Sequence, residues 1–415
     1  RIIERIGRVK VGDLACGSGT LLTASYSVFY RIAASLKYYY GLEDVDLESL
    51  GRRLIEEGIY GVDALKYASQ ITAINLALIG PGAIARENVY TIYLGYLHDT
   101  KQAWLGSLEL LNEPRSVGGL LAWIEGGLRG AVERASLEGF KEATELPERF
   151  DLVIMNPPFT RATGRSEQFR GERGLFGFIA GEDTRAKLLK AYNRVRDRVR
   201  GELRRIAEDL GPSLPGVFRD IIAGRLGELR QLLDIGQAGE GLLFLYLAYR
   251  YVGVGGVIAF VLPRGLLAGS TWFLARTLLA SRFHVKYVIV SSDAERGYNF
   301  SERASLSETL IVARRVEKHS SDNETVFVNL LRKPSTALEA LMLAEELKRA
   351  SRGLRVNEWR VVEVGGSSAL VLKVSRRQLL ENIDNWNRFV AVPDPELVRL
   401  FSNGLLENGV IELRG

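Results

Sequence analysis

The segment Val11–Leu22, with the sequence VGDLACGSGTLL, constrains the fold of this chain more than any other segment. An apolar run ends in Asp13, a loop of small residues follows, and a helix is predicted to begin after the loop. Glycine at positions 17 and 19 removes the Cβ atoms that would keep a ligand away from the backbone. The backbone N–H groups at the start of the helix point into the same space. This pattern is typical of a nucleotide-type site at the carboxyl end of a strand in an α/β sheet.

Short apolar runs of strand length alternate with helical segments along much of the chain, which predicts an α/β fold with a mainly parallel sheet. The predicted strands are Val9–Ala15, Gly58–Val62, Val89–Leu94, Asp151–Met155, Val257–Leu262, Tyr287–Ser291 and Thr309–Ala313. The predicted helices include Tyr67–Leu78, Glu240–Val252 and, after a change of pattern near Val316, Ser335–Ala350; a strand-rich tail follows.

Two long insertions interrupt this alternation, and both are predicted to be largely helical. The first spans residues 100–148 and the second spans residues 160–239. The second contains the arginine-rich stretch Arg194–Arg205, RVRDRVRGELRR. Two interpretations of this stretch remain open: a solvated amphipathic helix of mixed charge, or a helix that contacts phosphates beside the active site.

Composition limits the class of protein. Of the 415 residues, 47% are hydrophobic and 25% are charged, which is ordinary for a soluble globular protein, and we expect a cytoplasmic location. The net charge of +5 permits a polyanionic partner. One cysteine and three histidines exclude a disulfide framework and make a zinc site improbable, so no metal is expected.

The ligand of the glycine loop is predicted to be S-adenosylmethionine rather than a dinucleotide, because the three-glycine pyrophosphate fingerprint is absent. Asp13 and Ala15 can supply a carboxylate and a carbonyl near the ammonium group of this cofactor. The rest of the loop that we expect to line the site is Cys16, Gly17, Ser18 and Gly19.

A second acidic residue, Asp63, follows the predicted strand Gly58–Val62 and precedes Ala64. A carboxylate at this place can accept hydrogen bonds from both ribose hydroxyls of the cofactor, with Ala64 beside it. The alternative role for Asp63 is that of a helix N-cap, which aspartate favours.

The third motif is Asn156–Phe159, NPPF, at the end of the apolar run DLVIM. The two prolines, Pro157 and Pro158, restrict the backbone and hold the Asn156 side chain and the Pro157 carbonyl in place. Two fixed acceptors can take both N–H groups of a planar NH₂ group, so that its lone pair points at an incoming methyl group. Phe159 can stack on the base that carries this group.

The order DLACGSG and then NPPF resembles the N6-adenine DNA methyltransferases, as found in type I modification subunits and fused restriction–modification enzymes. GQAGEGLLFLYLAYRYVGVGGVIAFVLPRGLL resembles the family's later helix and strand. Tyr298-Asn299-Phe300, followed by ETLIVARR, resembles the loop with a second stacking aromatic. The resemblance covers roughly Val9 to Arg315.

This resemblance implies a Rossmann-like S-adenosylmethionine-dependent methyltransferase fold, with a catalytic domain at 1–315 and an extension at 316–415. The substrate would be an adenine flipped out of double-stranded DNA and held between Phe159 and Phe300. Specificity or restriction subunits or domains would be partners. The family often has an acid or Asn near the cofactor adenine, where this chain has IYLGYLHD with Tyr96 nearest; that contact is left unassigned.

Alternatives of two other kinds remain open. The NPP-aromatic loop also suits a methyltransferase for a protein glutamine amide or for RNA, and a non-catalytic DNA-binding subunit is a further possibility. The chain begins with Arg1, and only about eight residues precede the first predicted strand. We therefore expect the catalytic portion of a longer protein, whose tail is either the start of a target-recognition domain or a small complete C-terminal domain. Such a portion alone should bind DNA weakly, with strong salt dependence and little sequence preference.

Overall fold

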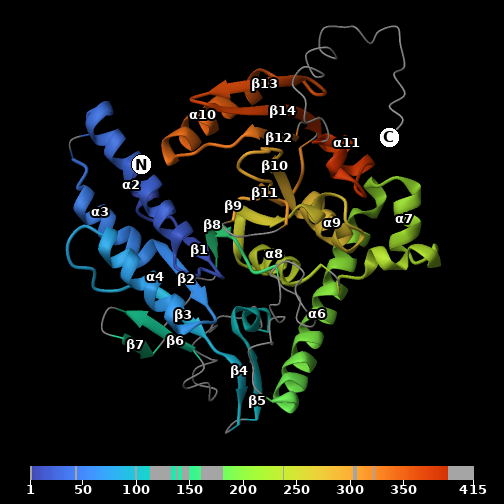
Figure 1. The fold of residues 1–415 in the computed structure, drawn as a ribbon, viewed down its shortest axis with the longest axis horizontal. Helices are drawn as coiled ribbons and strands as arrows, with labels where there is room; N and C mark the ends of the chain where they lie inside the picture. Colours follow the sequence, from blue (N-terminus) through green and yellow to red (C-terminus); the bar gives the residue numbers. More distant parts are fainter. Residues whose placement is uncertain are drawn as a thin grey trace. The chain divides into compact units, whose positions relative to one another are not determined.

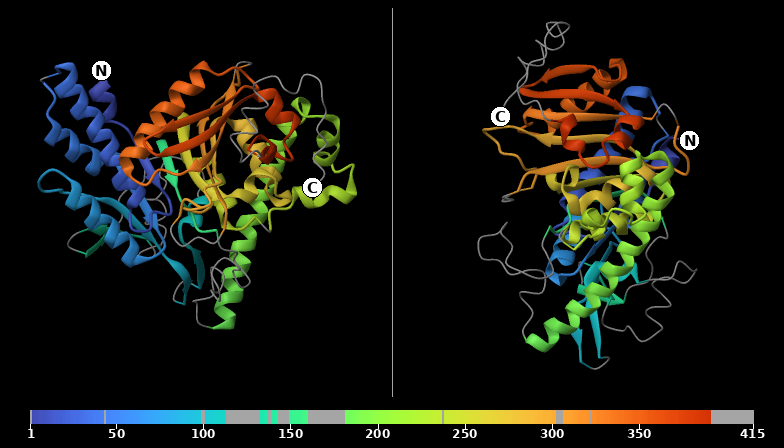
Figure 2. Two further views of the ribbon diagram at one scale, coloured as in Figure 1. Left: turned by 45° about the horizontal axis from the view of Figure 1, so that its top comes forward. Right: turned by 90° about the vertical axis from the view of Figure 1, so that its right-hand side faces the viewer.

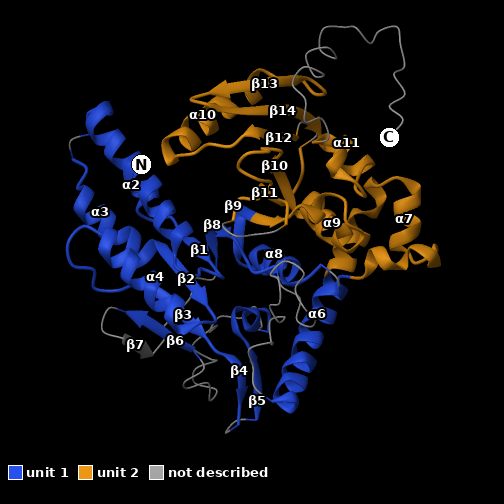
Figure 3. Cartoon of the chain, viewed as in Figure 1, with its two compact units in different colours: residues 1–202, 235–260 blue, residues 203–234, 261–415 orange. Residues whose placement is uncertain are grey.

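The computed structural model describes residues 2–42, 44–98, 101–112, 132–136, 139–142, 149–159, 181–236, 238–301, 306–320 and 323–390. The chain divides into two compact units (Figure 3). The first unit comprises residues 1–202 and 235–260, and the second comprises residues 203–234 and 261–415. The division differs from the predicted boundary at residue 315, which lies inside the second unit.

Within the described residues, the sheet of the first unit has five parallel strands. In spatial order they are β9 (Val252–Pro263), β8 (Phe150–Met155), β1 (Val11–Asp13), β2 (Ile59–Asp63) and β3 (Asn88–Ile92). Two antiparallel strands follow β3, namely β6 (Val132–Ser136) and β7 (Gly139–Glu142). From β1 the chain adds β2 and β3 on one side and β8 and β9 on the other. This reversal of strand order creates a switch point between β1 and β8, where α/β sheets bind ligands.

Helices α2 (Thr20–Tyr40) and α4 (Lys66–Ile79) pack on the strands β1, β2 and β3 of the first unit, and α3 (Leu47–Arg53) contacts α2 (Figures 1 and 2). The short α1 (Ile2–Ile6) contacts α2. Apolar side chains at helical spacing, such as Ala73 and Leu76 of α4, join Val11, Ile59 and Val89 of the strands in one buried cluster. Helix α8 (Glu240–Tyr251) has nine buried residues in succession, Glu240 to Ala248, and packs against β8.

The described part of the first insertion is mostly extended, so the prediction of a largely helical segment is not confirmed there. It contains β5 (Gln102–Leu105), which pairs in a hairpin with the preceding β4 (Leu94–Leu97), a 3₁₀ helix at Gly106–Leu111, and then β6 and β7. Residues 113–131 and 143–148 of this insertion lie outside the described residues. The described strands of this segment have only four or five residues each. The alternation of apolar and polar side chains that indicates a strand is therefore too short to recognise in the sequence.

The second insertion is helical where the structure describes it, as predicted. Helix α6 (Glu182–Leu210) includes the whole arginine-rich stretch, and α7 (Gly216–Ile222) and a 3₁₀ helix at Gly227–Leu233 follow. Along α6, apolar residues at helical spacing are buried: Leu188, Tyr192, Val195, Val199, Leu203 and Ile206. This pattern fits the interpretation of an amphipathic helix.

The second unit contains a sheet of five strands in the order β13 (Trp359–Val364), β14 (Ser367–Ser375), β12 (Glu324–Arg332), β10 (Phe283–Ser291) and β11 (Glu308–Arg315). All pairs are antiparallel except β10 and β12. Helix α10 (Ala337–Gly353) covers β13 and β14, while α9 (Phe273–Arg282) packs on β10. Helix α11 (Arg376–Glu381) contacts α9 and β14. Because β12 pairs with β10, the described strands after residue 316 belong to the same sheet as β10 and β11.

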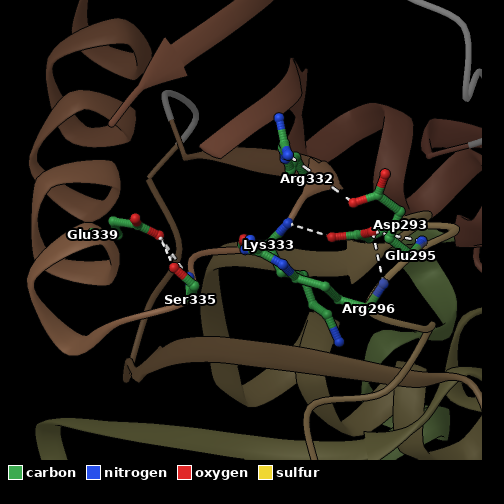
Figure 4. Close-up of polar contacts among 7 residues, drawn as sticks. All are labelled: Asp293, Glu295, Arg296, Arg332, Lys333, Ser335 and Glu339. Carbon is green, nitrogen blue, oxygen red and sulfur yellow. Dashed lines mark hydrogen bonds and ion pairs between the residues drawn. The ribbon is translucent and has the colours of Figure 1, made fainter. Parts of the chain in front are cut away.

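Asp293 ties together two loops at one end of this second sheet (Figure 4). Its Oδ1 accepts hydrogen bonds from the backbone N–H groups of Glu295 and Arg296, each at 2.9 Å, and its Oδ2 accepts one from Lys333 at 2.8 Å. Burial alone would raise the pKa of Asp293, but these three donors outweigh it and lower the pKa below its usual range. The turn after β10 is therefore fixed to the end of β12.

The seven strands and three helices expected from the sequence are confirmed, with shifted ends. The largest shift is at Val257–Leu262, which is part of the longer β9. Among the described residues, none of the helices combines the length and apolarity that crossing a membrane requires.

Candidate functional site

Three of the predicted site segments meet at one edge of the first unit's sheet. Strands β8, β1 and β2 run parallel, with Gly12 paired to Val153 and Asp13 paired to Gly61. Asp13 and Asp63 are the last residues of β1 and β2, and Asn156 directly follows β8. The carboxyl ends of parallel strands share an edge, so these residues follow neighbouring strands beside the switch point (Figure 1).

The glycine loop needs glycine at two positions for two different reasons. Gly17 has φ +54° and Gly19 has φ +80°, both in the left-handed region that favours glycine. A Cβ atom on Gly19 would lie 2.7 Å from Cγ2 of Thr72, whereas a Cβ on Gly17 would meet no atom within 4 Å. Gly19 therefore permits close packing against α4. Gly17 instead borders open space in the direction in which a Cβ atom would point.

Two residues of α4 that were not predicted as site residues hold the loop. The Thr72 hydroxyl donates a hydrogen bond to the Gly17 carbonyl at 2.8 Å, and the Asn75 amide donates one to the Ser18 carbonyl at 2.9 Å. The only sequence signal for them was their i, i+3 spacing on the predicted helix that follows Asp63. This spacing places both residues on one face of the helix but does not predict a contact with the loop. The loop's conformation is thus set by side chains about 55 residues away in sequence.

Cys16 has a structural position in the loop. Its backbone N–H donates a hydrogen bond to the Val62 carbonyl at 3.0 Å, and its side chain is 6% exposed. Burial, together with the nearby Asp13 and Asp63 carboxyl groups, raises the pKa of the thiol well above its usual range. The thiol is therefore neutral and inert, and its contribution to the site is to pack the loop onto β2.

Asp63 connects the two predicted halves of the cofactor site. Its Oδ2 accepts a hydrogen bond from the Gly17 N–H at 2.9 Å, and its Oδ1 accepts one from the Leu65 N–H at 2.9 Å. Burial raises the pKa of Asp63, and the hydrogen bonds from backbone N–H groups oppose this rise. The N-cap of α4 is Leu65, so the alternative role of Asp63 as helix N-cap is wrong.

Ala64, beside Asp63, is half-buried, and the backbone of Gly106 lies close to its side chain. A Cβ atom on Gly106, which has φ +61°, would lie 2.9 Å from the Ala64 Cβ. The segment after β5 therefore closes onto the end of β2. The Gly106 N–H also donates a hydrogen bond to the Tyr93 carbonyl at 3.0 Å, which fixes this segment to the residue that follows β3.

Asp13 is a buried carboxyl group that accepts a backbone hydrogen bond. It is 2% exposed, and its Oδ1 accepts a hydrogen bond from the Ala15 N–H at 3.0 Å. Burial raises the pKa of Asp13 to about 8; the Ala15 hydrogen bond lowers it and the Asp63 charge raises it further. A buried carboxyl group of this kind gains most from a cation, since a positive charge nearby restores its ionised form.

The NPPF segment directly follows β8, and exposed and buried side chains alternate along its first three residues. The side chains of Asn156 and Pro158 are exposed, Pro157 is buried and Phe159 is half-buried. A buried proline after an exposed asparagine anchors the backbone while the amide remains at the surface. The structure describes this loop as far as Phe159.

The second predicted stacking aromatic, Phe300, belongs to the second unit. It is half-buried and packs against the cluster formed by α10 and the sheet, whereas Tyr298 in the same loop is 50% exposed. Oε2 of buried Glu308 accepts hydrogen bonds from the N–H groups of Phe300 and Ser301 at 2.6 and 2.8 Å, which fixes the loop. The pairing of Phe159 with Phe300 stays a prediction.

Tyr93, and not Tyr96, directly follows β3, while the contact to the cofactor adenine stays unassigned. Strand β3 ends at Ile92, so Tyr93 is the first residue after the strand. Tyr96 lies in β4 and has Lys187 of α6 over its ring, at 4.5 Å from the centroid. The sequence stretch IYLGYLHD could not distinguish the two, since both tyrosines follow an apolar run.

No family model and no curated protein matches this sequence. Solved structures with a similar fold include the type I restriction-modification methyltransferase subunit from Streptococcus thermophilus, at 14% identity and TM-score 0.43, over 92% of this chain and 53% of that one. The M protein of the type I restriction enzyme EcoKI has 14% identity and TM-score 0.46, over 97% of this chain and 68% of that one. The type IIG restriction endonuclease BpuSI has 15% identity and TM-score 0.45, over 93% and 31%. The chain spans about half the length of the first and a third of the last. The proposed function therefore rests on the site.

Proposed function

We propose that this chain is an S-adenosylmethionine-dependent methyltransferase that methylates an exocyclic amino group, with N6 of adenine in DNA as the target. One observation supports it above all. The glycine loop, Asp13 and Asp63 form one hydrogen-bonded unit at the carboxyl edge of the sheet, and Asn156 leaves the neighbouring strand at the same edge. A cofactor loop and an NPP-aromatic loop on adjacent strands suit transfer between two bound groups.

The residues at this edge fit the cofactor. Asp13 offers a buried carboxylate for its ammonium group, with the Ala15 carbonyl beside it, and Gly17 leaves open space at the loop. Each oxygen of Asp63 accepts one backbone hydrogen bond and retains capacity for a ribose hydroxyl. When bound, the cofactor supplies a methyl group on a sulfonium cation. Its positive charge also offsets the cost of ionising Asp13.

Asn156 and the Pro157 carbonyl perform the orienting step in this proposal. The Asn156 side-chain oxygen and the Pro157 carbonyl accept the two N–H groups of the target amine. The amino nitrogen then becomes more tetrahedral, and its lone pair is directed at the methyl group rather than delocalised into the ring. Proline at 157 and 158 holds both acceptors without further ordering at the moment of reaction.

An adenine inside a duplex cannot reach such a loop, so the target base would leave the stack. Phe159 would support one face of the base, and an aromatic of the 298–300 loop, Phe300 in our prediction, would support the other. A place in a restriction–modification or related defence system, with specificity or restriction partners, follows from the resemblance of the motifs. The net charge of +5 is compatible with DNA as the partner.

The test is transfer of labelled methyl groups from S-adenosylmethionine by the purified chain to duplex DNA, structured RNA and protein extract in parallel. We expect label in DNA, as N6-methyladenine after digestion to nucleosides, and none with Asn156→Ala. Label in protein as N5-methylglutamine, or in RNA, would replace DNA by the alternative substrate. Cofactor binding without transfer to any of the three would favour the non-catalytic DNA-binding subunit.

A further inference from the structure

A basic groove lies between the β4–β5 hairpin and helix α6, within the first unit. It encloses about 540 Å³ and is lined on the hairpin side by Tyr96 and Lys101, and on the helix side by Lys187, Lys190 and Arg194. Figures 1 and 2 show the hairpin and α6 side by side. Four of its lining residues are cations, against one acid, Glu109.

The acid does not neutralise the groove. Glu109 is 7% exposed, and its carboxylate accepts hydrogen bonds from the Leu105 N–H at 2.9 Å and the Asn112 amide at 2.6 Å. Burial raises the pKa of Glu109, and these donors and the Arg198 charge oppose that rise. Its role is to cap the segment that follows β5.

Three of the four cations are available to a ligand. Lys187 pairs with Asp183 at 2.6 Å and lies over the Tyr96 ring. Within the described residues, the side chains of Lys101, Lys190 and Arg194 form no ion pair or hydrogen bond, and all three are exposed. Unpaired cations that converge on one groove favour an anionic ligand.

The spacing along α6 fits several phosphates in a row. Lys187, Lys190 and Arg194 are at positions i, i+3 and i+7, so they share one face of the helix. At about 1.5 Å per residue, seven residues span roughly 10 Å. One strand of a DNA duplex carries a charge about every 3.4 Å of axis. The groove therefore matches two or three successive phosphates, which is more than a mononucleotide needs.

Several arginines of α6 that follow Arg194 are engaged in other contacts. Arg198 donates hydrogen bonds to the Leu111 carbonyl and to Asn112, both at 2.8 Å. Arg204 donates to the Leu233 carbonyl at 3.2 Å through its terminal nitrogen, and Arg200 lies 3.4 Å from Asp197. These arginines hold neighbouring segments together, so the cations available for phosphate are at the preceding end of the helix.

We infer that this groove binds the sugar-phosphate backbone of duplex DNA. The groove contacts phosphates beside the transfer site and does not recognise the base sequence. The inference relies on the proposed function only for the identity of the polyanion. Phosphate is the ligand rather than a base, because Lys187 covers the Tyr96 ring and Trp104 is buried. The hairpin begins two residues after β3 ends, so the groove starts from the same sheet edge as Asp13 and Asp63.

The test compares Lys190→Gln/Arg194→Gln with the wild type by fluorescence anisotropy on a labelled 30-base-pair duplex, from 50 to 500 mM salt. Loss of two phosphate contacts should reduce the magnitude of the negative slope of log K, the association constant, against log salt by about 1.8. Binding at 0.1 M salt should weaken about 60-fold. The matched control is Arg349→Gln/Arg352→Gln, two exposed arginines at i and i+3 on α10 that remove the same charge. It should bind DNA like the wild type.

Other measurements separate this inference from the proposed function. Binding of S-adenosylmethionine by calorimetry should be unchanged in the groove variant, and methyl transfer at saturating DNA should stay within about twofold, with a raised KM. An unchanged salt slope in an active enzyme would overturn the groove alone. Failure to methylate DNA, with the slope lowered as expected, would overturn the proposed function alone. Competition by micromolar pyrophosphate, or RNA binding tenfold tighter than DNA, would also refute the inference.

Discussion

The Oδ2 atom of Asp63, at the end of β2, accepts a hydrogen bond from the backbone N–H of Gly17 across 2.9 Å. This bond joins two motifs that are 46 residues apart and that the sequence shows as separate features. Because Asp63 also holds the Leu65 N–H, one carboxylate sets the shape of the glycine loop and of the entry to α4. Replacing it should therefore change both the ribose contact and the loop.

Asp63→Ala should weaken S-adenosylmethionine binding. Loss of a charged acceptor that is largely buried costs about 1.5–3 kcal/mol, or roughly 10- to 150-fold in affinity. Isothermal calorimetry measures this directly. The matched control is Asp46→Ala, since Asp46 accepts hydrogen bonds from the N–H groups of Glu48 and Ser49 at the start of α3 in the same unit. The control should lower Tm but leave affinity unchanged; equal affinity of both variants would refute the ribose role.

Cofactor affinity should have a maximum near pH 8. Burial raises the pKa of Asp13 to about 8, so below that pH the free protein must release a proton before it can pair with the ammonium group. The acidic limb should fall by up to about tenfold per pH unit. Above about pH 8 the α-amino group of the cofactor loses its own proton. Asp13→Asn keeps the site's shape but should remove the acidic limb; if that limb persists in calorimetric titrations, Asp13 is not the group that titrates.

The same pKa predicts how stability depends on pH. In the unfolded chain Asp13 ionises near pH 3.8, whereas in the folded protein it stays protonated up to about pH 8. The folded state therefore binds more protons between these values, and the contribution of Asp13 to stability is complete below pH 3.8 and declines as the pH rises toward 8. Chemical denaturation at pH 5 and pH 8 should show a smaller loss of stability in Asp13→Asn than in the wild type.

Alanine at the two loop glycines should have different effects. Gly19→Ala places a Cβ 2.7 Å from Thr72 at φ +80°, so the variant should lose stability, by about 1–3 kcal/mol, through overpacking and strain. Gly17→Ala meets no atom within 4 Å, and its cost is the left-handed backbone alone, about 1 kcal/mol. Its methyl group would enter the space assigned to the cofactor. Denaturation and calorimetry should thus show Gly19→Ala as the less stable protein and Gly17→Ala as a folded protein with impaired binding.

Asn156→Ala should abolish methyl transfer, with a loss of at least about 100-fold in kcat, while S-adenosylmethionine binding survives. The exposed Asn156 amide directly follows β8, and in the proposed role it contacts the target amine rather than the cofactor. Single-turnover transfer to DNA gives the rate, and calorimetry gives the affinity. A variant that transfers methyl groups at the wild-type rate would remove Asn156 from the proposed role.

Phe159→Ala should weaken capture of the flipped base by about 1–3 kcal/mol, the usual contribution of one aromatic stacked on a base. Fluorescence of 2-aminopurine at the target position reports extrusion of the base. The second aromatic is identified by comparing Phe300→Ala with Tyr298→Ala, because Phe300 packs in the cluster while Tyr298 is half-exposed. If only Tyr298→Ala reduces the signal at unchanged Tm, Tyr298 rather than Phe300 contacts the base.

Local patterns predicted the elements of the first unit well. Asp13, Asp63 and Asn156 each follow a short apolar run, and each run forms a strand that ends at or directly before that residue. The helices at residues 66–79 and 240–251 were predicted to within two residues at either end for the same reason, since periodicity of apolar side chains acts within one element. The strands in the described part of the first insertion were not predicted, because strands of four or five residues offer too few alternations to outweigh helix-forming composition.

The sequence alone determined which chemical groups this protein has and the order in which strands present them. Only the tertiary structure decided which of those groups meet. Parallel pairing of β1, β2 and β8 brings Asp13, Asp63 and the NPPF loop to one edge, and α4 supplies Thr72 and Asn75 to hold the glycine loop. It also decided that Arg198 and Arg204 serve internal carbonyl groups while Lys190 and Arg194 remain available. The reason is physical: a residue's type is local, but its partners, its burial and therefore its charge depend on segments far away in the chain.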